Sequence, residues 1–186
     1  LQVGLAGRTE HYSDFGSATT GKLSARYDFT PQVALRGTIN NAYHAPSLGQ
    51  IGTSWTTTTN LDVNGNPVLT RMLPADNPAA RALGAQPLKP EKSTNYSLGL
   101  VLRPSEHASL TIDAYQIAIR DRLVFSGGIS GPLAEQILTN AGYGQYSWAQ
   151  FMTNAADTRT RGVDIVGKYN LGLAQFGDLN LSAGYT

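Results

Sequence analysis

The chain has few residues that could carry out catalysis. Its three histidines, His11, His44 and His107, are too widely separated for the short ligand spacings of a zinc site. The sequence has no Gly-x-Ser-x-Gly elbow, no His-Glu-x-x-His helix and no phosphate-binding loop. It has no cysteine, so thiol chemistry is excluded. We therefore predict no catalytic residue, no metal ligand and no cofactor, and we do not expect an enzyme.

Aromatic residues in polar surroundings are better candidates for binding a small molecule. Segment 143–151 reads YGQYSWAQF, and another tryptophan lies in the threonine-rich stretch 53–60. Aromatic faces can stack on a ligand while neighbouring polar groups orient it. Packing of the loops on themselves explains the same pattern, so both interpretations stay open. The candidate ligand-binding residues are Trp55, Tyr143, Tyr146 and Trp148.

Most of the sequence alternates between apolar and polar residues with a period of two, which indicates β-strands. In 22–30, Leu23 and Tyr27 lie on one face and Arg26 on the other. In 32–43, the same rule puts Ile39 and Tyr43 on the apolar face. The expected strands are approximately 1–10, 21–30, 32–44, 93–103, 107–122, 158–171 and 177–186, in a single segment.

Short and long connections alternate along the chain. The turns at 30–31, 104–106 and 172–177 are brief, whereas 45–92 and 123–157 are long. An up-and-down antiparallel meander with this alternation has its long loops at one end. Within the loops, NGNP at 64–67 predicts a turn, and 78–84 and 132–139 each predict a short helix with proline in the first turn.

The stretch 108–122 does not keep one phase. Leu110 and Ile112 alternate in one register, whereas Tyr115 and Ile117 fall in the other. A β-bulge would switch the face of everything beyond it. Alternatively, the second half of the strand rises above a membrane and packs against loops. The sequence leaves both open.

Strand length favours a transmembrane barrel over a soluble sandwich, although a sandwich would show the same alternation with its faces exchanged. Soluble strands average about 5–6 residues, whereas barrel strands need about 9–11 to cross a bilayer. A basic residue facing lipid at the midplane costs about 2–4 kcal/mol, so charged residues should face the lumen. The predicted lumen-facing polar residues are Arg26, Arg36, Asn40, Asp164 and Lys168.

Composition excludes two other classes of protein. With 14 basic and 13 acidic residues, the formal charge is +1, and no basic run with interleaved aromatic residues indicates nucleic-acid binding. No window approaches the 18 or more consecutive apolar residues of a transmembrane helix, a test that barrel strands do not need to pass.

Four ordered patterns resemble the C-terminal barrel region of TonB-dependent outer-membrane receptors. They are LRGTINNAYHAPSLGQI at 35–51, LKPEKSTNYSLGL at 88–100, TIDAYQIAIRDRL at 111–123 and NAADTRTRGVDI at 154–165. The resemblance implies an all-β, 22-stranded transmembrane barrel in the bacterial cell outer membrane. It also implies a plug domain that fills the barrel, energy supplied through the TonB complex, and import of a small-molecule nutrient such as an iron–siderophore complex.

The chain departs from a complete receptor, because it has no plug and no segment for the TonB partner, and it begins with Leu1. We therefore expect an internal piece of a longer protein, whose partners are outer-membrane lipid, its own plug and the TonB complex. Exposed strand edges predict edge-to-edge self-association of the isolated piece. Two alternatives remain, a soluble all-β adhesion or carbohydrate-binding module and a passive porin-type channel.

Overall fold

The structure, a computed structural model, describes residues 1–13 and 15–186, with the side chains of Thr59 and Asn60 left aside. Contacts divide the chain into two compact units. Unit 1 comprises residues 1–43, 92–119 and 158–186, and unit 2 comprises residues 44–91 and 120–157. Among the described residues, no helix is long and apolar enough to cross a membrane.

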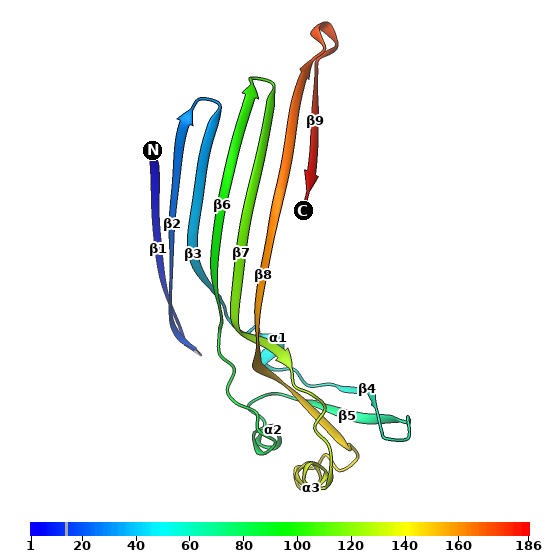
Figure 1. The fold of residues 1–186 in the computed structure, drawn as a ribbon. Coiled ribbons are helices and arrows are strands. Elements are labelled where there is room, and N and C mark those ends of the chain that lie inside the picture. The colour runs from blue at the N-terminus through cyan, green and yellow to red at the C-terminus, as the bar shows by residue number, and fades with distance from the viewer. Residues whose placement is uncertain (14) are drawn as a thin grey trace. The chain divides into compact units, whose positions relative to one another are not determined.

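Unit 1 is built from long antiparallel strands that lie side by side (Figure 1). The order across the sheet is β1, β2, β3, β6, β7, β8 and then β9. All-β meander architecture, predicted from the alternation, is confirmed. The strands are β1 (Gln2–Tyr12), β2 (Gly16–Thr30), β3 (Val33–His44), β6 (Glu91–Ser105), β7 (Ala108–Phe125), β8 (Trp148–Gly172) and β9 (Asp178–Tyr185), of which β3, β6, β7 and β8 extend into unit 2.

The register separates the side chains of unit 1 into two faces. Leu5 lies opposite Leu23, which lies opposite Ile39, and at the other edge Tyr169 lies opposite Leu181. Because side chains alternate along a strand, these residues define one apolar face. The residues between them form the other, the polar face.

Unit 2 contains secondary structure that an irregular loop would lack. Strands β4 (Thr56–Leu61) and β5 (Pro67–Leu73) form a hairpin, as the turn signal at 64–67 predicts. Beside them lie α1 (Leu48–Ile51), α2 (Pro78–Ala82) and α3 (Pro132–Asn140), of which α2 and α3 confirm the two predicted helices. The 3-10 helix η1 (Ala174–Phe176) belongs to unit 1 and leads into β9.

Pairing in unit 2 differs from a meander of sequential neighbours. Strand β5 pairs in parallel with the first residues of β8, with Thr70 opposite Trp148 and Leu73 opposite Phe151. This pairing joins two segments that were expected to be long loops, 45–92 and 123–157, and it lies outside the seven expected strands. It arises because β5, the second strand of a hairpin, pairs with the edge of a segment far along the chain.

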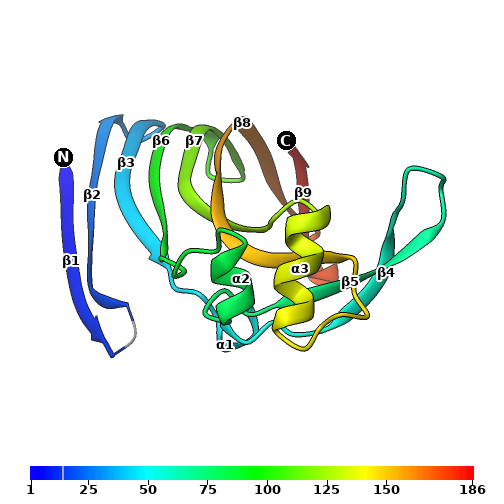
Figure 2. The ribbon, with the colours of Figure 1, turned by 90° about the horizontal axis from the view of Figure 1, so that it is seen from below.

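Helices cover one face of this small sheet (Figure 2). Leu73 of β5 and Leu138 of α3 are fully buried, together with Ala80 of α2 and Ala149 of β8. Pro78 and Pro132 stand in the first turns of their helices, where the missing amide proton costs nothing. Burial of these aliphatic side chains gives unit 2 its own hydrophobic core.

Candidate functional site

The register between β5 and β8 assigns each side chain of unit 2 to one of two faces. Paired residues of parallel strands point to the same side, so Arg71 and Ala149 share the face covered by helices, the helix face. Met72 and its partner Gln150 share the opposite side, which we call the open face. Thr56 pairs with Arg71 and therefore lies on the helix face.

The four aromatic residues predicted to bind a ligand are divided between these faces. Tyr143 and Tyr146 pack against the core on the helix face. Trp148 pairs with Thr70, two residues before Met72, so it belongs to the open face. Trp55 precedes Thr56 and lines a hollow with Met72, also on the open face. The structure does not bring the four together into one platform.

The two tyrosines surround Arg71. Its guanidinium carbon lies 5.4 Å from the ring centre of Tyr143 and 5.8 Å from that of Tyr146, within range of cation–π attraction. Arg71 also donates to the hydroxyl of Ser54 over 2.9 Å. The hydroxyl of Thr56, 3.0 Å from the Tyr146 hydroxyl, lowers the Tyr146 pKa, and the charge of Arg71 acts in the same direction. These contacts fasten segment 141–147 to β5.

The open face holds a hollow with aromatic walls. Its volume is about 380 Å³, within the range of sites that take small molecules. The side chains of Trp55 and Phe125 remain 55% and 49% exposed, and their ring centres are 6.2 Å apart. The hollow is lined by Trp55, Thr56, Thr57, Met72, Phe125 and Gln150.

The residues that line the hollow carry no formal charge, so the hollow can bind a ligand through stacking and hydrogen bonds but not through ion pairs. Rings can stack on an apolar or aromatic ligand group, and the Gln150 amide can form hydrogen bonds, whereas the Thr56 hydroxyl already contacts the Tyr146 hydroxyl on the helix face. Gln150 already donates to the Ser126 carbonyl over 3.3 Å, which holds its amide beside Phe125. Nothing in this arrangement supplies a nucleophile or a base. The hollow is suited to binding.

Sequence reasoning missed Phe125, Met72 and Gln150. Met72 and Gln150 lie side by side only because β5 and β8 pair in parallel, and no local sequence pattern predicts that pairing. Phe125 ends β7, beyond the point where alternation breaks down. The one sequence signal that could have identified Phe125 is its position as an aromatic residue at the end of an irregular strand.

Trp148 has a packing contact of its own. A side chain at Gly128 would place its Cβ 2.3 Å from Cε3 of the indole, so the ring occupies the space above this glycine. The adjacent backbone is fixed by a bridge between Ile129 and Ala149. Trp148 therefore covers segment 126–129, and its ligand-binding role stays a prediction.

All five residues predicted to face a lumen share the polar face of unit 1. Arg26 lies directly opposite Arg36, and Asn40 lies opposite Lys22 in the same alternation. Lys168 lies opposite Ser182, and Asp164 precedes it by four residues. The structure thus brings them onto one side of one sheet. Their exposure to a lumen stays a prediction.

Ion pairs organise this face. Arg36 donates from Nε and Nη2 to both carboxylate oxygens of Asp113, over 3.1 and 2.6 Å. Gly99 of β6, between them, makes room, since a Cβ there would lie 2.0 Å from Oδ1 of Asp113. Arg26 pairs with Asp28 over 2.7 Å. Asp113 was not among the predicted residues, because its stretch has no constant phase.

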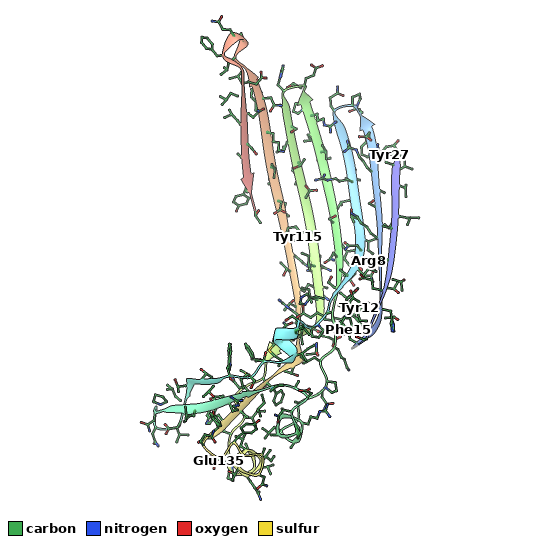
Figure 3. All side chains as sticks on the ribbon, turned by 180° about the vertical axis from the view of Figure 1, so that it is seen from behind. Arg8, Tyr12, Phe15, Tyr27, Tyr115 and Glu135 are labelled. Atoms are coloured by element: carbon green, nitrogen blue, oxygen red, sulfur yellow. The ribbon has the colours of Figure 1, made fainter. Side chains whose placement is uncertain are left out.

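The structure resolves the phase of β7. Asp113 lies on the polar face with Arg36, and Tyr115, two residues on, follows the same alternation (Figure 3). The ring of Tyr115 covers Gly162 of β8, where a Cβ would lie 2.4 Å from the tyrosine hydroxyl. The irregularity comes later, at Asp121, whose φ of 56° is left-handed. No bulge is therefore needed between Asp113 and Tyr115.

Tyr43 lies on the other face from the one that simple alternation predicts. Its hydroxyl donates to Glu10 and contacts the Tyr12 hydroxyl at 2.7 Å, and both partners belong to the polar face. The cause is Asn41, whose side chain accepts from the Gly21 amide at 2.7 Å and donates to the Thr19 carbonyl at 3.1 Å. The Asn41 amide thus takes the place of backbone in the ladder, and the phase changes beyond it.

Comparison with known proteins decides the family. A family model described as "TonB dependent receptor-like, beta-barrel" matches residues 1–186, the whole chain. The chain belongs to the TonB-dependent receptor family. This confirms the resemblance that its four sequence patterns indicate. No curated protein matches the chain closely enough in sequence to serve as a relative.

Solved receptors share the fold of this TonB-dependent receptor segment. The siderophore receptor PirA from Pseudomonas aeruginosa matches with a TM-score of 0.64 and 18% identity, over 98% of this chain and 31% of PirA. PirA from Acinetobacter baumannii gives 0.63 and 18%, over 91% and 23%. A mutant of the ferric enterobactin receptor PfeA from Pseudomonas aeruginosa, in complex with enterobactin, gives 0.66 and 17%, over 98% and 24%. The chain therefore spans roughly a quarter of these receptors.

Proposed function

We propose that this segment forms part of the barrel wall of a bacterial outer-membrane receptor that imports a scarce nutrient such as an iron–siderophore complex. The observation that carries the proposal is the apolar face of unit 1. Its large side chains are widely exposed, for example Leu5 at 81% and Leu98 at 56%. Soluble proteins rarely expose apolar surface that continues across several strands. Lipid is the environment that such a face requires.

The polar face supports the same orientation. It carries paired charges, including Arg36 with Asp113 and Arg26 with Asp28, which are costly against lipid but are tolerated in a wet lumen. In the family, a plug domain fills the barrel, so we propose that this face meets the receptor's own plug. Energy would reach the receptor through the TonB complex, and both partners belong to the full-length protein.

The hollow on the open face of unit 2 is our candidate for nutrient contact. Trp55 and Phe125 offer exposed rings beside hydrogen-bonding groups. Similar solved structures are described as siderophore receptors, and one holds enterobactin. For this chain we propose the same general class of cargo, bound in part by the ring faces in the hollow.

Uptake in cells tests the proposal. The full-length receptor that contains this segment would be expressed in a receptor-deficient strain under iron limitation, and accumulation of radiolabelled iron–siderophore complexes would be measured. Trp55→Ala with Phe125→Ala should reduce uptake at least tenfold at equal surface abundance. Phe176→Ala removes an even more exposed ring, in η1 of unit 1, and serves as the control.

Energy dependence separates the receptor from a passive channel. We expect uptake to stop when the proton gradient is collapsed or when TonB is deleted. Uptake that continues unchanged without TonB would favour the porin-type alternative. No uptake of any siderophore, with the protein correctly inserted, would contradict the proposed class of cargo.

A further inference from the structure

The hollow on the open face of unit 2 is lined by uncharged side chains. Among the described residues, its lining includes no Lys, Arg, Asp or Glu. Unit 2 as a whole has five basic and six acidic residues, which gives it a formal charge of −1 with histidine neutral. Neither the lining nor the charge of the whole unit therefore provides Coulomb attraction for an anion.

The arginine that adjoins the lining in sequence points away from the hollow. Arg71 precedes Met72 in β5, so its side chain lies on the helix face while that of Met72 lies on the open face. Its guanidinium carbon lies 5.4 Å from the ring centre of Tyr143, and Nη2 donates to the Ser54 hydroxyl over 2.9 Å. These contacts hold the positive charge on the side of the sheet opposite to the hollow.

Aromatic walls add a further penalty for an anion. The ring centres of Trp55 and Phe125 are 6.2 Å apart, and a ligand group that contacts either ring loses water on that side. Removal of water from a charged group is costly unless an ion pair or hydrogen bonds replace it, and the cost is much smaller for a neutral group. The faces of aromatic rings also carry negative electrostatic potential, which repels an anion.

Gln150 can orient a neutral ligand in the hollow. Its Nε2 donates to the Ser126 carbonyl over 3.3 Å, and its Oε1 has no hydrogen-bond partner among the described residues. An amide oxygen only accepts hydrogen bonds, so it attracts an N–H or O–H group and repels the oxygen of a carboxylate or phenolate. The hollow therefore suits an uncharged group that carries a donor, such as an amide or a hydroxyl group beside an alkyl or aromatic part.

We propose that the hollow selects ferric chelates without net charge over polyanionic ones. In a hydroxamate complex the charges of the ligand groups cancel that of the ferric ion, whereas catecholates lose both hydroxyl protons and leave the complex strongly negative. The preferred cargo is therefore of the hydroxamate class. This inference rests on the proposed import of an iron–siderophore complex and names the chemical class within it. The receptor structure that holds enterobactin is 17% identical to this chain, a level that shows a shared fold and does not specify the charge of the cargo.

Binding of neutral and anionic chelates tests the inference. The purified full-length receptor would be titrated in detergent with ferrichrome and ferric coprogen, both neutral, and with ferric enterobactin, an anion, by isothermal titration calorimetry. We expect the neutral chelates to bind about tenfold more tightly. Gln150→Lys places a cation in the hollow and keeps a donor for the Ser126 carbonyl. It should raise the affinity for ferric enterobactin about fivefold without raising that for ferrichrome. Thr57→Lys, on the same face, should act in the same direction.

The matched control adds the same charge to β5 on the helix face. Leu69 is 43% exposed and precedes Arg71 by two residues, so Leu69→Lys should leave the preference unchanged. An equal gain for ferric enterobactin in Leu69→Lys and Gln150→Lys, or no gain in either hollow variant, would overturn the proposal. Binding of ferric enterobactin as tight as that of ferrichrome by the unaltered receptor would also overturn it. Binding of none of the three chelates would instead contradict the proposed cargo, and this inference would fall with it.

Discussion

Arg36 and Asp113 form a bidentate ion pair across the intervening strand β6, and Gly99 is the residue that leaves room for it. The pair thus ties β3 to the distant hairpin of β6 and β7 on one face. A Cβ at position 99 would lie 2.0 Å from Oδ1 of Asp113 and 2.9 Å from Nε of Arg36. The ion pair and the glycine must therefore be considered together.

Substitution of Gly99 should destabilise the barrel wall. Gly99→Ala forces the ion pair to move, and Gly99→Val should be worse; overpacking of this kind costs about 1–3 kcal/mol. Thermal unfolding of the full-length receptor in detergent would measure the change. Gly167→Ala, in β8 with open space around its Cβ, is the control and should be nearly neutral. Equal melting temperatures for Gly99→Val and Gly167→Ala would contradict this account.

Loss of the Asn41 side chain should destabilise the pairing of β2 with β3. It replaces backbone partners in the ladder between β2 and β3, with bonds of 2.7 and 3.1 Å. Asn41→Ala should cost about 1–3 kcal/mol, because the Gly21 amide and the Thr19 carbonyl lose their partner. Asn41→Asp keeps the acceptor but loses the donor and should be intermediate. Amide hydrogen exchange at Gly21 would report the effect, and unchanged protection in Asn41→Ala would refute it.

Low pH should loosen the tip of the β4–β5 hairpin. The side chain of Asn66 and nearby amides bond to Asp62 and hold the pKa of its carboxyl below the usual value of about 3.9. A pKa that is lower in the folded state contributes stability above pH 4, and this stability is lost as the pH falls through the folded value. Protease cleavage at 62–66 should therefore rise below pH 4. Asp62→Asn should be cleaved more readily at pH 7 and should lose most of this pH dependence.

The packing of Tyr143 and Tyr146 around Arg71 should stabilise the position of segment 141–147. Tyr146→Phe removes the hydrogen bond with Thr56 but keeps the ring near Arg71, so it should cost about 1 kcal/mol. Arg71→Ala removes the cation and its contact with Ser54 and should be the more damaging. Hydrogen exchange of segment 141–147 would compare them. Greater exchange in Tyr146→Phe than in Arg71→Ala would count against cation–π fastening.

Local pattern predicted the strands, because a period of two is a property of each strand by itself. Every expected strand range overlaps a strand of the structure, although several strands extend beyond the expected bounds, and the hairpin follows from the turn residues at 64–67. Tyr43 was misplaced because the phase change depends on a tertiary bond from Asn41 to β2. The hollow was missed because Met72 and Gln150 meet through parallel pairing of distant segments. Contacts set by long-range register are not encoded in alternation.

Adjacent residues along the strands of unit 1 should face lipid and a wet interior in turn. The chain has no cysteine, so single cysteines can carry a spin label without competition from native thiols in this segment. Label at Leu98→Cys and Ile165→Cys should be relaxed mainly by oxygen dissolved in lipid. At the neighbours Ser97→Cys and Asp164→Cys, it should be relaxed mainly by a water-soluble nickel complex. Equal accessibility to the nickel complex at all four positions in the reconstituted full-length receptor would contradict the account.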